Sequence, residues 1–433
     1  MDDTIASRLK MTRRSFLGTS AAAAATVALG QNAAFAAEEI KFWDMVWGTG
    51  ASYTAAAREL VGSYQPAGDN LGVRYQSIPW ANWYQTFTSA AASRTTPAVS
   101  SGAAFLPFYF IEKGVIAPAD DLIASIDKAG TNDFLPGVLD AMKTDLGYAA
   151  MPWSMDLRVI WVRKSLLEKA GVEAPTDWQS FIKVGEALKK IDVVGLGLAG
   201  GSTTTDGQHT VSALLINNGG GLFAKDGTLD CVNDRNIETL DFLNELVRKG
   251  IIDPYAASYT SDNVTRDWLS GRIGMGFGQT GLDKNFPAEQ QPDLAVISPI
   301  KSPRGDTGTV YYINPLMMFK TTASQASSEA FLGWYLDNMK IFWEKGVAID
   351  VPVRKSIADL PILKQNANLQ KSIAEWQPIG KTIGAQAPHP FGALNAVDGG
   401  GAGAAFIQQI IEGKTGSKQI LETLQAALEK IVK

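Results

Sequence analysis

Residues 175–199, PTDWQSFIKVGEALKKIDVVGLGLA, place a segment of helical period directly before a short apolar run. Pro175 and a capping box from Thr176 to Gln179 mark the start of a helix over 178–191. The run 193–199 is apolar and short enough to predict a strand. Four residues at helical spacing give the helix one apolar face, namely Trp178, Phe181, Gly185 and Leu188.

The same alternation extends along the chain in both directions. Helices are predicted over 236–249, where Gly250 supplies a C-cap, and after Ser417. Alternating strands and helices indicate an α/β fold, and a length of 433 residues favours two domains over one. The remaining predicted strands are 40–47, 73–80, 273–278, 294–300 and 316–320.

Residues 1–36 have the composition of an export signal. Lys10, Arg13 and Arg14 precede an Ala-rich apolar run over 16–30, and Ala36 ends a run of small residues suited to cleavage. The paired arginines resemble a twin-arginine signal, which predicts export by the twin-arginine machinery to the periplasm. A membrane anchor is the alternative, but the run is shorter than the roughly 20 apolar residues that a spanning helix needs.

Composition excludes several other classes of protein. The formal net charge of -5 argues against nucleic acid as a partner. The single Cys231 cannot form an intramolecular disulfide, and with only His209 and His389 it cannot build a Cys/His zinc site. No glycine run has the spacing of a nucleotide-binding loop, so no nucleotide cofactor is expected. No metal is expected either, because the Cys and His residues are too few for a Cys/His site.

Aromatic residues follow the ends of several predicted strands. Trp47 comes after the first strand, and Trp80, Trp83 and Tyr84 come after the second. Ligands of open α/β sheets bind outside the carboxyl ends of strands, where an aromatic ring can pack against the C–H face of a sugar. Trp153, Tyr311 and Tyr312 occupy similar positions, and the alternative for each aromatic residue is a place in the core.

Charged and amide side chains close to these aromatic residues suit the recognition of sugar hydroxyl groups. Carboxylates and guanidinium groups can each bond two neighbouring hydroxyls. The alternative is an ordinary ion pair, which we favour for Arg158 and leave open for Asp156 and Arg354. The candidates are Asp156, Arg158, Gln279, Asn314 and Arg354.

An enzyme would need a nucleophile with a base, a metal cluster or a pair of carboxylates. The sequence has neither a Gly-x-Ser-x-Gly elbow nor a His-Glu-x-x-His pair, and His209 stands without such partners. A pair of carboxylates cannot be located from sequence, so a secreted carbohydrate-active hydrolase remains the alternative to a binding protein without catalysis.

Several stretches together resemble the extracellular solute-binding proteins of carbohydrate ATP-binding-cassette (ABC) importers, the group of maltose-binding protein. The resemblance covers essentially the whole chain after the signal. Residues 151–167, MPWSMDLRVIWVRKSLL, with 175–178, PTDW, are similar to the hinge strand of the family and the helix after it. Further similar stretches, in the same order, are 217–221, 269–275 and 351–356.

The resemblance implies a two-lobed periplasmic-binding-protein fold with a hinge and a ligand cleft between the lobes. One lobe would comprise 37–155 with about 316–375, and the other 156–315 with about 376–433. The chain would be a monomer that binds a small carbohydrate and delivers it to the permease subunits of the importer. Ligand contacts are expected from Trp47, Thr49, Trp80, Gly102, Phe105, Trp153, Asp156, His209, Gln279, Tyr311, Asn314, Arg354 and residues near His389.

Two departures from the family keep the identity of the sugar open. Residues 100–105, SSGAAF, stand where relatives often have an acidic or aromatic residue, and 278–281, GQTG, lack a stacking tryptophan. The sequence therefore does not choose between mono- and oligosaccharides or between neutral and anionic sugars.

Overall fold

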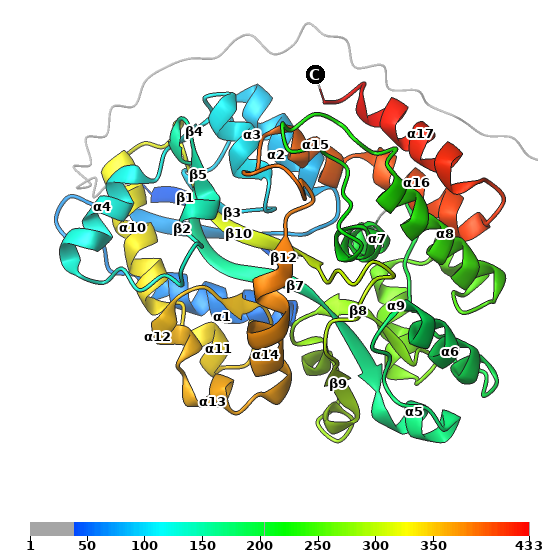
Figure 1. Ribbon diagram of the computed structural model, residues 1–433. Helices are drawn as coiled ribbons and strands as arrows, with labels where there is room; N and C mark the ends of the chain where they lie inside the picture. The colour runs from blue at the N-terminus through cyan, green and yellow to red at the C-terminus, as the bar shows by residue number, and fades with distance from the viewer. Residues whose placement is uncertain (1–38, 203, 433) are drawn as a thin grey trace, which may run out of the picture. The chain divides into compact units, whose positions relative to one another are not determined.

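The computed structural model describes residues 39–202 and 204–432, and the predicted export signal lies outside them. Strands and helices alternate along this part of the chain (Figure 1). The strands are β1 (Glu39–Met45), β2 (Gly72–Ile78), β3 (Val99–Ser101), β4 (Ile116–Ala117), β5 (Lys143–Thr144), β6 (Gly147–Tyr148), β7 (Met151–Arg163), β8 (Met275–Gln279), β9 (Leu294–Val296), β10 (Thr309–Phe319), β11 (Val351–Pro352) and β12 (Gly380–Lys381).

The helices differ widely in length. Those of seven residues or more are α1 (Ala51–Gly62), α2 (Trp83–Ser93), α3 (Leu106–Glu112), α4 (Asp120–Ala129), α5 (Lys164–Ala170), α6 (Trp178–Lys189), α7 (Asp206–Asn217), α8 (Asp234–Arg248), α9 (Ser261–Leu269), α10 (Gln325–Asn338), α15 (Ala393–Gly399), α16 (Gly401–Glu412) and α17 (Ser417–Leu428). The shorter α-helices are α11 (Ile341–Glu344), α12 (Lys355–Ala358), α13 (Pro361–Lys364) and α14 (Ala367–Lys371).

The first sheet has the order β11-β7-β10-β3-β1-β2. β1 lies between β2 and β3 and is parallel to both, while β10 is antiparallel to β3 and β7 is antiparallel to β10. The carboxyl ends of the three parallel strands therefore meet at one edge of the sheet, directly before Trp47, Trp80 and Gly102.

β7 belongs to two groups of strands. Its first half pairs with β10 and β11, and its second half pairs with β8 and β9. In Figure 1, β7 runs from the region of β10 to the region of β8 and β9. The chain thus has the mixed α/β architecture that the sequence predicts, with β7 connecting the strands of its two lobes.

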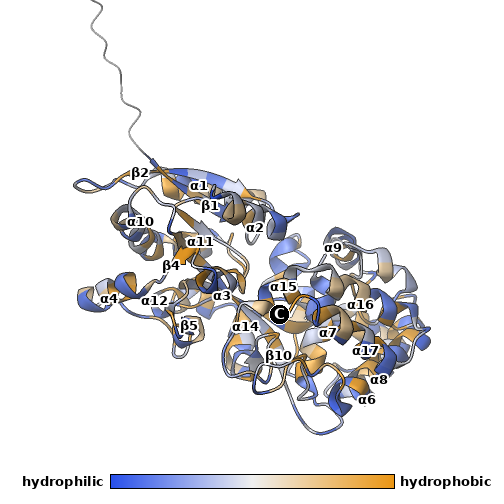
Figure 2. Ribbon diagram, turned by 90° about the horizontal axis from the view of Figure 1, so that it is seen from above, coloured by the Kyte–Doolittle hydropathy of each residue, from blue (hydrophilic) through white to orange (hydrophobic). Residues whose placement is uncertain are grey.

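Alternation of side chains along β1 lets helices cover both faces of the first sheet. Phe42 contacts Phe331 of α10 at a ring-centroid distance of 5.3 Å, and the next residue, Trp43, contacts Phe87 of α2 at 5.6 Å. Consecutive strand residues point to opposite faces, so α10 and α2 lie on opposite sides of β1. In Figure 2, helices such as α8 and α17 carry both hydrophilic and hydrophobic residues, as amphipathic helices do.

The predicted helices are confirmed with small shifts. α6 begins at the predicted Trp178, but its capping box runs from Asp177 to Ser180, one residue later than predicted. The Asp177 carboxylate accepts from the Ser180 backbone N–H, and the Ser180 hydroxyl accepts from the Asp177 backbone N–H. The ring of Trp178 stacks on Phe242 of α8, with centroids 4.3 Å apart. The predicted strand over 193–199 is wrong: only the isolated bridges Val194–Ile273 and Leu196–Ile252 form there.

Candidate functional site

A cavity of about 650 Å³ opens where the carboxyl ends of β1 and β2 approach the middle of β7. Its lining comes from both groups of strands, from α7 and α9, and from the segments that follow β1, β2 and β3. The cavity falls within the size range of small-molecule sites.

Three tryptophans form an aromatic wall on one side of the cavity. Trp47 and Trp80 meet edge to face with centroids 5.0 Å apart, and Trp83 lies 6.4 Å beyond Trp80. Trp80 is 40% exposed, an unusual value for tryptophan, although its indole N–H is held by the Val46 carbonyl at 2.7 Å. A fixed and exposed indole face is suited to pack against the C–H face of a ring-shaped ligand.

Buried hydrogen bonds fix the orientation of Trp47. Its indole N–H donates to Ser101 Oγ at 3.1 Å, and that hydroxyl donates to the Asp44 carboxylate at 2.7 Å. Burial raises the pKa of Asp44 to about 7, although hydrogen bonds from Ser101 and its neighbours oppose this shift. The aromatic wall therefore rests on a polar network beneath the ends of β1 and β3.

Opposite this wall, polar side chains project from three adjacent strands. Asp156 and Arg158 are two residues apart on β7 and share a face, as do Tyr312 and Asn314 on β10. The strand register sets Tyr312 opposite Asp156 and Gln279 of β8 opposite Arg158. Pairing of β7 with two partners thus brings four polar positions and a tyrosine to one place.

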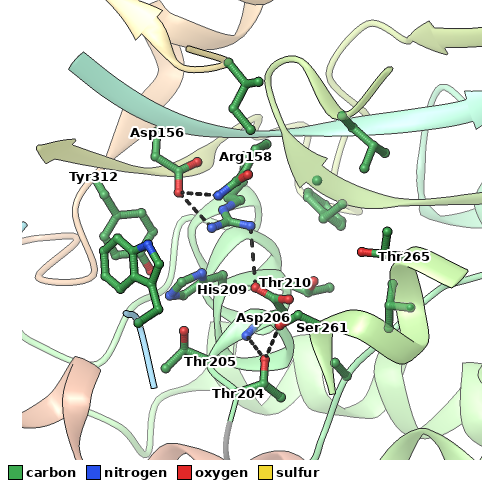
Figure 3. A pocket seen from close by; sticks show the side chains of 18 of the residues that line it. Asp156, Arg158, Thr204, Thr205, Asp206, His209, Thr210, Ser261, Thr265 and Tyr312 are labelled. Carbon is green, nitrogen blue, oxygen red and sulfur yellow. Dashed lines mark hydrogen bonds and ion pairs between the residues drawn. The ribbon is translucent and has the colours of Figure 1, made fainter. Parts of the chain in front are cut away.

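Arg158 lies at the centre of this polar group. Its guanidinium Nη2 is 2.8 Å from the Asp156 carboxylate, and Nη1 is 3.9 Å from Asp206 of α7 (Figure 3). Gln279 Nε2 donates to the same Asp156 oxygen at 3.4 Å. Within the part of the chain that the structure describes, Arg158 Nε and Asp156 Oδ1 have no hydrogen-bond partner although both are buried.

A second polar group lies at His209, Tyr312 and Asp398. The rings of His209 and Tyr312 have centroids 4.6 Å apart, and His209 Nε2 is 3.5 Å from Asp398 Oδ1. Both imidazole nitrogens, the Tyr312 hydroxyl and Asp398 Oδ1 are buried, and none of them bonds to another described residue. Unpaired buried polar groups cost free energy unless a ligand or water satisfies them.

Asp350 supports the polar wall from below. Its carboxylate accepts from Asn314 Nδ2 at 2.9 Å and from Ser154 Oγ at 3.2 Å. Burial raises its pKa to about 7, and the nearby Asp156 carboxylate acts in the same direction. The polar wall therefore rests on a buried carboxylate, that of Asp350, which takes up a proton more readily than an exposed one.

Half of the residues predicted from the sequence line this cavity. The structure brings together Trp47, Trp80, Asp156, His209, Gln279 and Asn314. They come from segments far apart in the chain, so their convergence identifies this cavity as the candidate site.

Four other predicted residues lie outside the lining and support it. Trp153 is 2% exposed and packs behind Trp47 with centroids 5.2 Å apart. Phe105 contacts the far side of Tyr312, and Gly102 lies against Met317 and Leu106. Thr49 donates its backbone N–H to the Val347 carbonyl at 3.1 Å, and its side chain is buried.

The remaining two predicted residues, Tyr311 and Arg354, lie away from the cavity. Tyr311 is an odd number of residues from Asn314, so the pleat of β10 turns it away from the cavity and against Gly380. Arg354 bonds to Asp133, Asp337 and the Thr131 carbonyl, outside the cavity lining. His389 is also absent from the lining.

Sequence reasoning missed several residues of the lining or assigned them elsewhere. Arg158 was expected in an ion pair and lies in the site, and Tyr312 rather than Tyr311 faces the cavity. The two-residue period from Asn314 could have identified Tyr312. No local pattern marked other residues of the lining, among them Asp206, Ser261, Trp268, Phe277, Asp350 and Asp398.

Within residues 39–202 and 204–432, no group of three His, Cys, Asp or Glu side chains is arranged to hold a metal ion. Over the same ranges, no helix combines the length and the apolar character that crossing a membrane requires.

Comparison with known proteins gives concordant matches. The profile of the family described as bacterial extracellular solute-binding protein matches residues 47–340. A crystal structure of a sugar transporter from Arthrobacter chlorophenolicus A6 with bound laminaribiose is 41% identical, with a TM-score of 0.87, and the match covers 92% of this chain and 100% of that one.

Two curated proteins match at lower identity. A probable sugar-binding periplasmic protein of Rhizobium meliloti is 22% identical over 443 residues, covering 96% of this chain and 99% of that protein. A putative ABC transporter periplasmic-binding protein of Escherichia coli, YcjN, is 22% identical over 321 residues, covering 71% of this chain and 73% of that protein.

Proposed function

This chain belongs to the bacterial extracellular solute-binding proteins and is a sugar-binding component of an ABC importer, and we propose that its ligand is a disaccharide of β-linked glucose. The 41% identical structure holds laminaribiose, a sugar of this kind. The observation that carries the proposal is the pairing, in one cavity, of an exposed indole face with buried polar atoms that lack partners.

The two walls of the cavity match the two kinds of surface on a sugar. A pyranose ring packs its C–H face on Trp80, while its hydroxyls bond to groups at the ring edge. Asp156 and Arg158 offer a charged acceptor and a charged donor side by side, which suits two adjacent hydroxyls. His209 and Asp398 offer imidazole nitrogens and a carboxylate oxygen at the other polar group.

Ligand capture proceeds by closure of two lobes about the strands that pass between them. The sequence predicts one lobe over 37–155 with about 316–375 and the other over 156–315 with about 376–433. Contacts of Asn368 with Asp283 and with the β9 backbone favour a boundary before α14 rather than after it. Sugar stabilises the closed form because only there do Trp80 and Asp156 contact it together.

The residues that precede the described part direct export. Residues 1–36 act as a twin-arginine signal, the folded chain crosses to the periplasm, and cleavage occurs near Ala36. There the monomer delivers the sugar to the permease subunits and performs no catalysis.

A thermal-shift screen tests the function. At 100 times its dissociation constant, a ligand stabilises the protein by about 2.7 kcal/mol, which raises the midpoint by several degrees. We expect a shift with laminaribiose and a smaller one or none with maltose, xylobiose and monosaccharides. A flat response across the panel would contradict the proposal.

Prolonged incubation with laminaribiose separates binding from hydrolysis. We expect the disaccharide to be recovered unchanged. New reducing ends that increase with time and with protein concentration would instead support the hydrolase alternative.

A further inference from the structure

The cavity has a pronounced excess of acidic groups. Among the described residues that line it, Arg158 is the only lysine or arginine. Five aspartates share the lining, namely Asp156, Asp206, Asp262, Asp350 and Asp398. Arg158 already contacts Asp156 and Asp206, and these carboxylates offset its positive charge. Its attraction for an anionic ligand is therefore weak.

Asp398 is the least compensated of the buried carboxylates among them. It is 7% exposed, and its Oδ1 accepts no hydrogen bond from any residue that the structure describes. The nearest basic group is the imidazole of His209, whose Nε2 lies 3.5 Å away. A buried carboxylate oxygen that lacks a donor favours a ligand that brings one, and it repels a ligand that brings another acceptor.

Asp262 provides a natural contrast within the same cavity. It lines the cavity at the first turn of α9 but is exposed, so water screens its charge. The buried and the exposed carboxylate should therefore act differently on a charged ligand.

We propose that the cavity selects uncharged or amino-bearing disaccharides against acidic ones, and that Asp398 is a specificity-determining residue in this choice. The inference rests on the proposed sugar-binding function and names the class of sugar. A carboxylate on the sugar about 8 Å from Asp398, at an effective dielectric constant of about 20, weakens binding by roughly 30-fold. An ammonium group at the same place has the opposite sign and gains affinity.

Calorimetric titration of the protein with matched sugars tests this inference. The probes are laminaribiose, two analogues with glucuronic acid in place of either glucose, and one with glucosamine. We expect both acidic analogues to bind at least about 30-fold more weakly than laminaribiose, and the amino analogue to bind as tightly or more tightly. Acidic analogues with dissociation constants within threefold of that of laminaribiose would overturn this proposal, while the proposed sugar-binding function would still hold.

Variants then assign the selectivity to one residue. Asp398→Asn keeps the shape of the side chain and should reduce the ratio of acidic to neutral dissociation constants about 30-fold, since it removes the charge that sets this ratio. Asp262→Asn is the control and should change this ratio less than twofold. An equal effect of both variants, or none from Asp398→Asn in a folded protein, would refute the role of Asp398.

The comparison of sugars in the unmodified protein keeps the proposal testable even if Asp398→Asn does not fold. If none of the sugars binds, the proposed function fails and the inference fails with it. If laminaribiose binds and selectivity is absent, only the inference fails.

Discussion

Arg158 and Arg354 each contact two aspartates, and the two sites differ in what remains unpaired. Arg354 donates to Asp133, Asp337 and the Thr131 carbonyl, so every nitrogen of its guanidinium has a partner. Arg158 contacts Asp156 and Asp206, while its Nε and Asp156 Oδ1 are buried without one among the described residues. We call a cluster saturated when each buried polar atom has a hydrogen-bond partner, and unsaturated when some have none. The saturated cluster stabilises the fold, whereas the unsaturated one can bond to a ligand.

The ion pair predicted for Arg158 forms with Asp156, but it is buried and lines the cavity. Both arginines are largely buried, and each lies within or just after a strand. The sequence around them therefore does not show which of them lines the site. Their partners separate them. Asp133 and Thr131 lie in the loop after α4, far from the cavity lining, while Asp206 begins α7 beside it.

Loss of the saturated cluster should produce the largest effect on stability. We expect Arg354→Ala to lower the free energy of unfolding by about 3 kcal/mol, because three donors are removed and Asp133 loses its cation. Urea denaturation measures this loss. Calorimetry should find the laminaribiose dissociation constant within twofold of the original value, and a tenfold change would place Arg354 in the binding site.

Loss of the unsaturated cluster should mainly affect binding. We expect Arg158→Gln to weaken laminaribiose binding about 30- to 100-fold, since hydrogen bonds to charged groups contribute about 1.5–3 kcal/mol. Arg163→Gln is the matched control, because Arg163 lies on the same strand and pairs with Asp293 outside the cavity. Equal losses in the two variants would show that β7 was disturbed as a whole.

Two aspartates near these arginines, Asp350 and Asp133, should affect the pH dependence of stability in opposite directions. Burial raises the pKa of Asp350 to about 7, so the folded protein retains a proton that the unfolded chain releases, and this contribution to stability is lost as pH rises toward 7. Burial alone would raise the pKa of the Asp133 carboxyl, but hydrogen bonds from Ser356 and Arg354 outweigh it and lower this pKa. Its contribution is therefore lost as pH falls.

Asp350→Asn should flatten the decrease in unfolding free energy between pH 5 and 7 by on the order of 2 kcal/mol. Denaturation curves at several pH values measure this slope. Asp133→Asn should leave that slope unchanged and reduce stability at neutral pH. A steeper slope after Asp350→Asn would contradict the assignment.

The aromatic wall should give the smallest of these effects. We expect Trp80→Ala to weaken sugar binding about 10-fold, the value of one lost stacking contact, and to leave the unliganded midpoint within a few degrees because the ring is 40% exposed. Tyr255→Ala is the control, since Tyr255 is 70% exposed and lies outside the lining. A large loss of stability in Trp80→Ala would show that this indole belongs to the core.

Sequence patterns predicted where helices lie better than they predicted which strands pair with one another. The period of 3.6 located α6, α8 and α17, since an amphipathic helix records its environment in its own residues. Residues 193–199 failed because Gly195 packs against Ile251 and Gly185, and this stretch forms bridges rather than a ladder. An apolar run alone does not specify a strand partner.

The candidate site was predictable mainly where strand ends or pleats determine it, and His209 of α7 was predicted from the family resemblance. Trp47 and Trp80 follow from their positions after β1 and β2, and Asp156 from its place beside Trp153. Asp398 belongs to α15, nearly two hundred positions after its neighbour His209, and Asp350 follows a short helix. Their approach depends on tertiary packing that no local spacing encodes.

We propose that the unsaturated cluster around Arg158 holds a β-linked glucose disaccharide. Isothermal titration of the protein with laminaribiose, performed side by side with Arg158→Gln, tests this proposal most directly. We expect saturable binding at one site per chain in the first titration and binding at least 30-fold weaker in the second. Absence of binding in the first, or equal affinity in both, would contradict it.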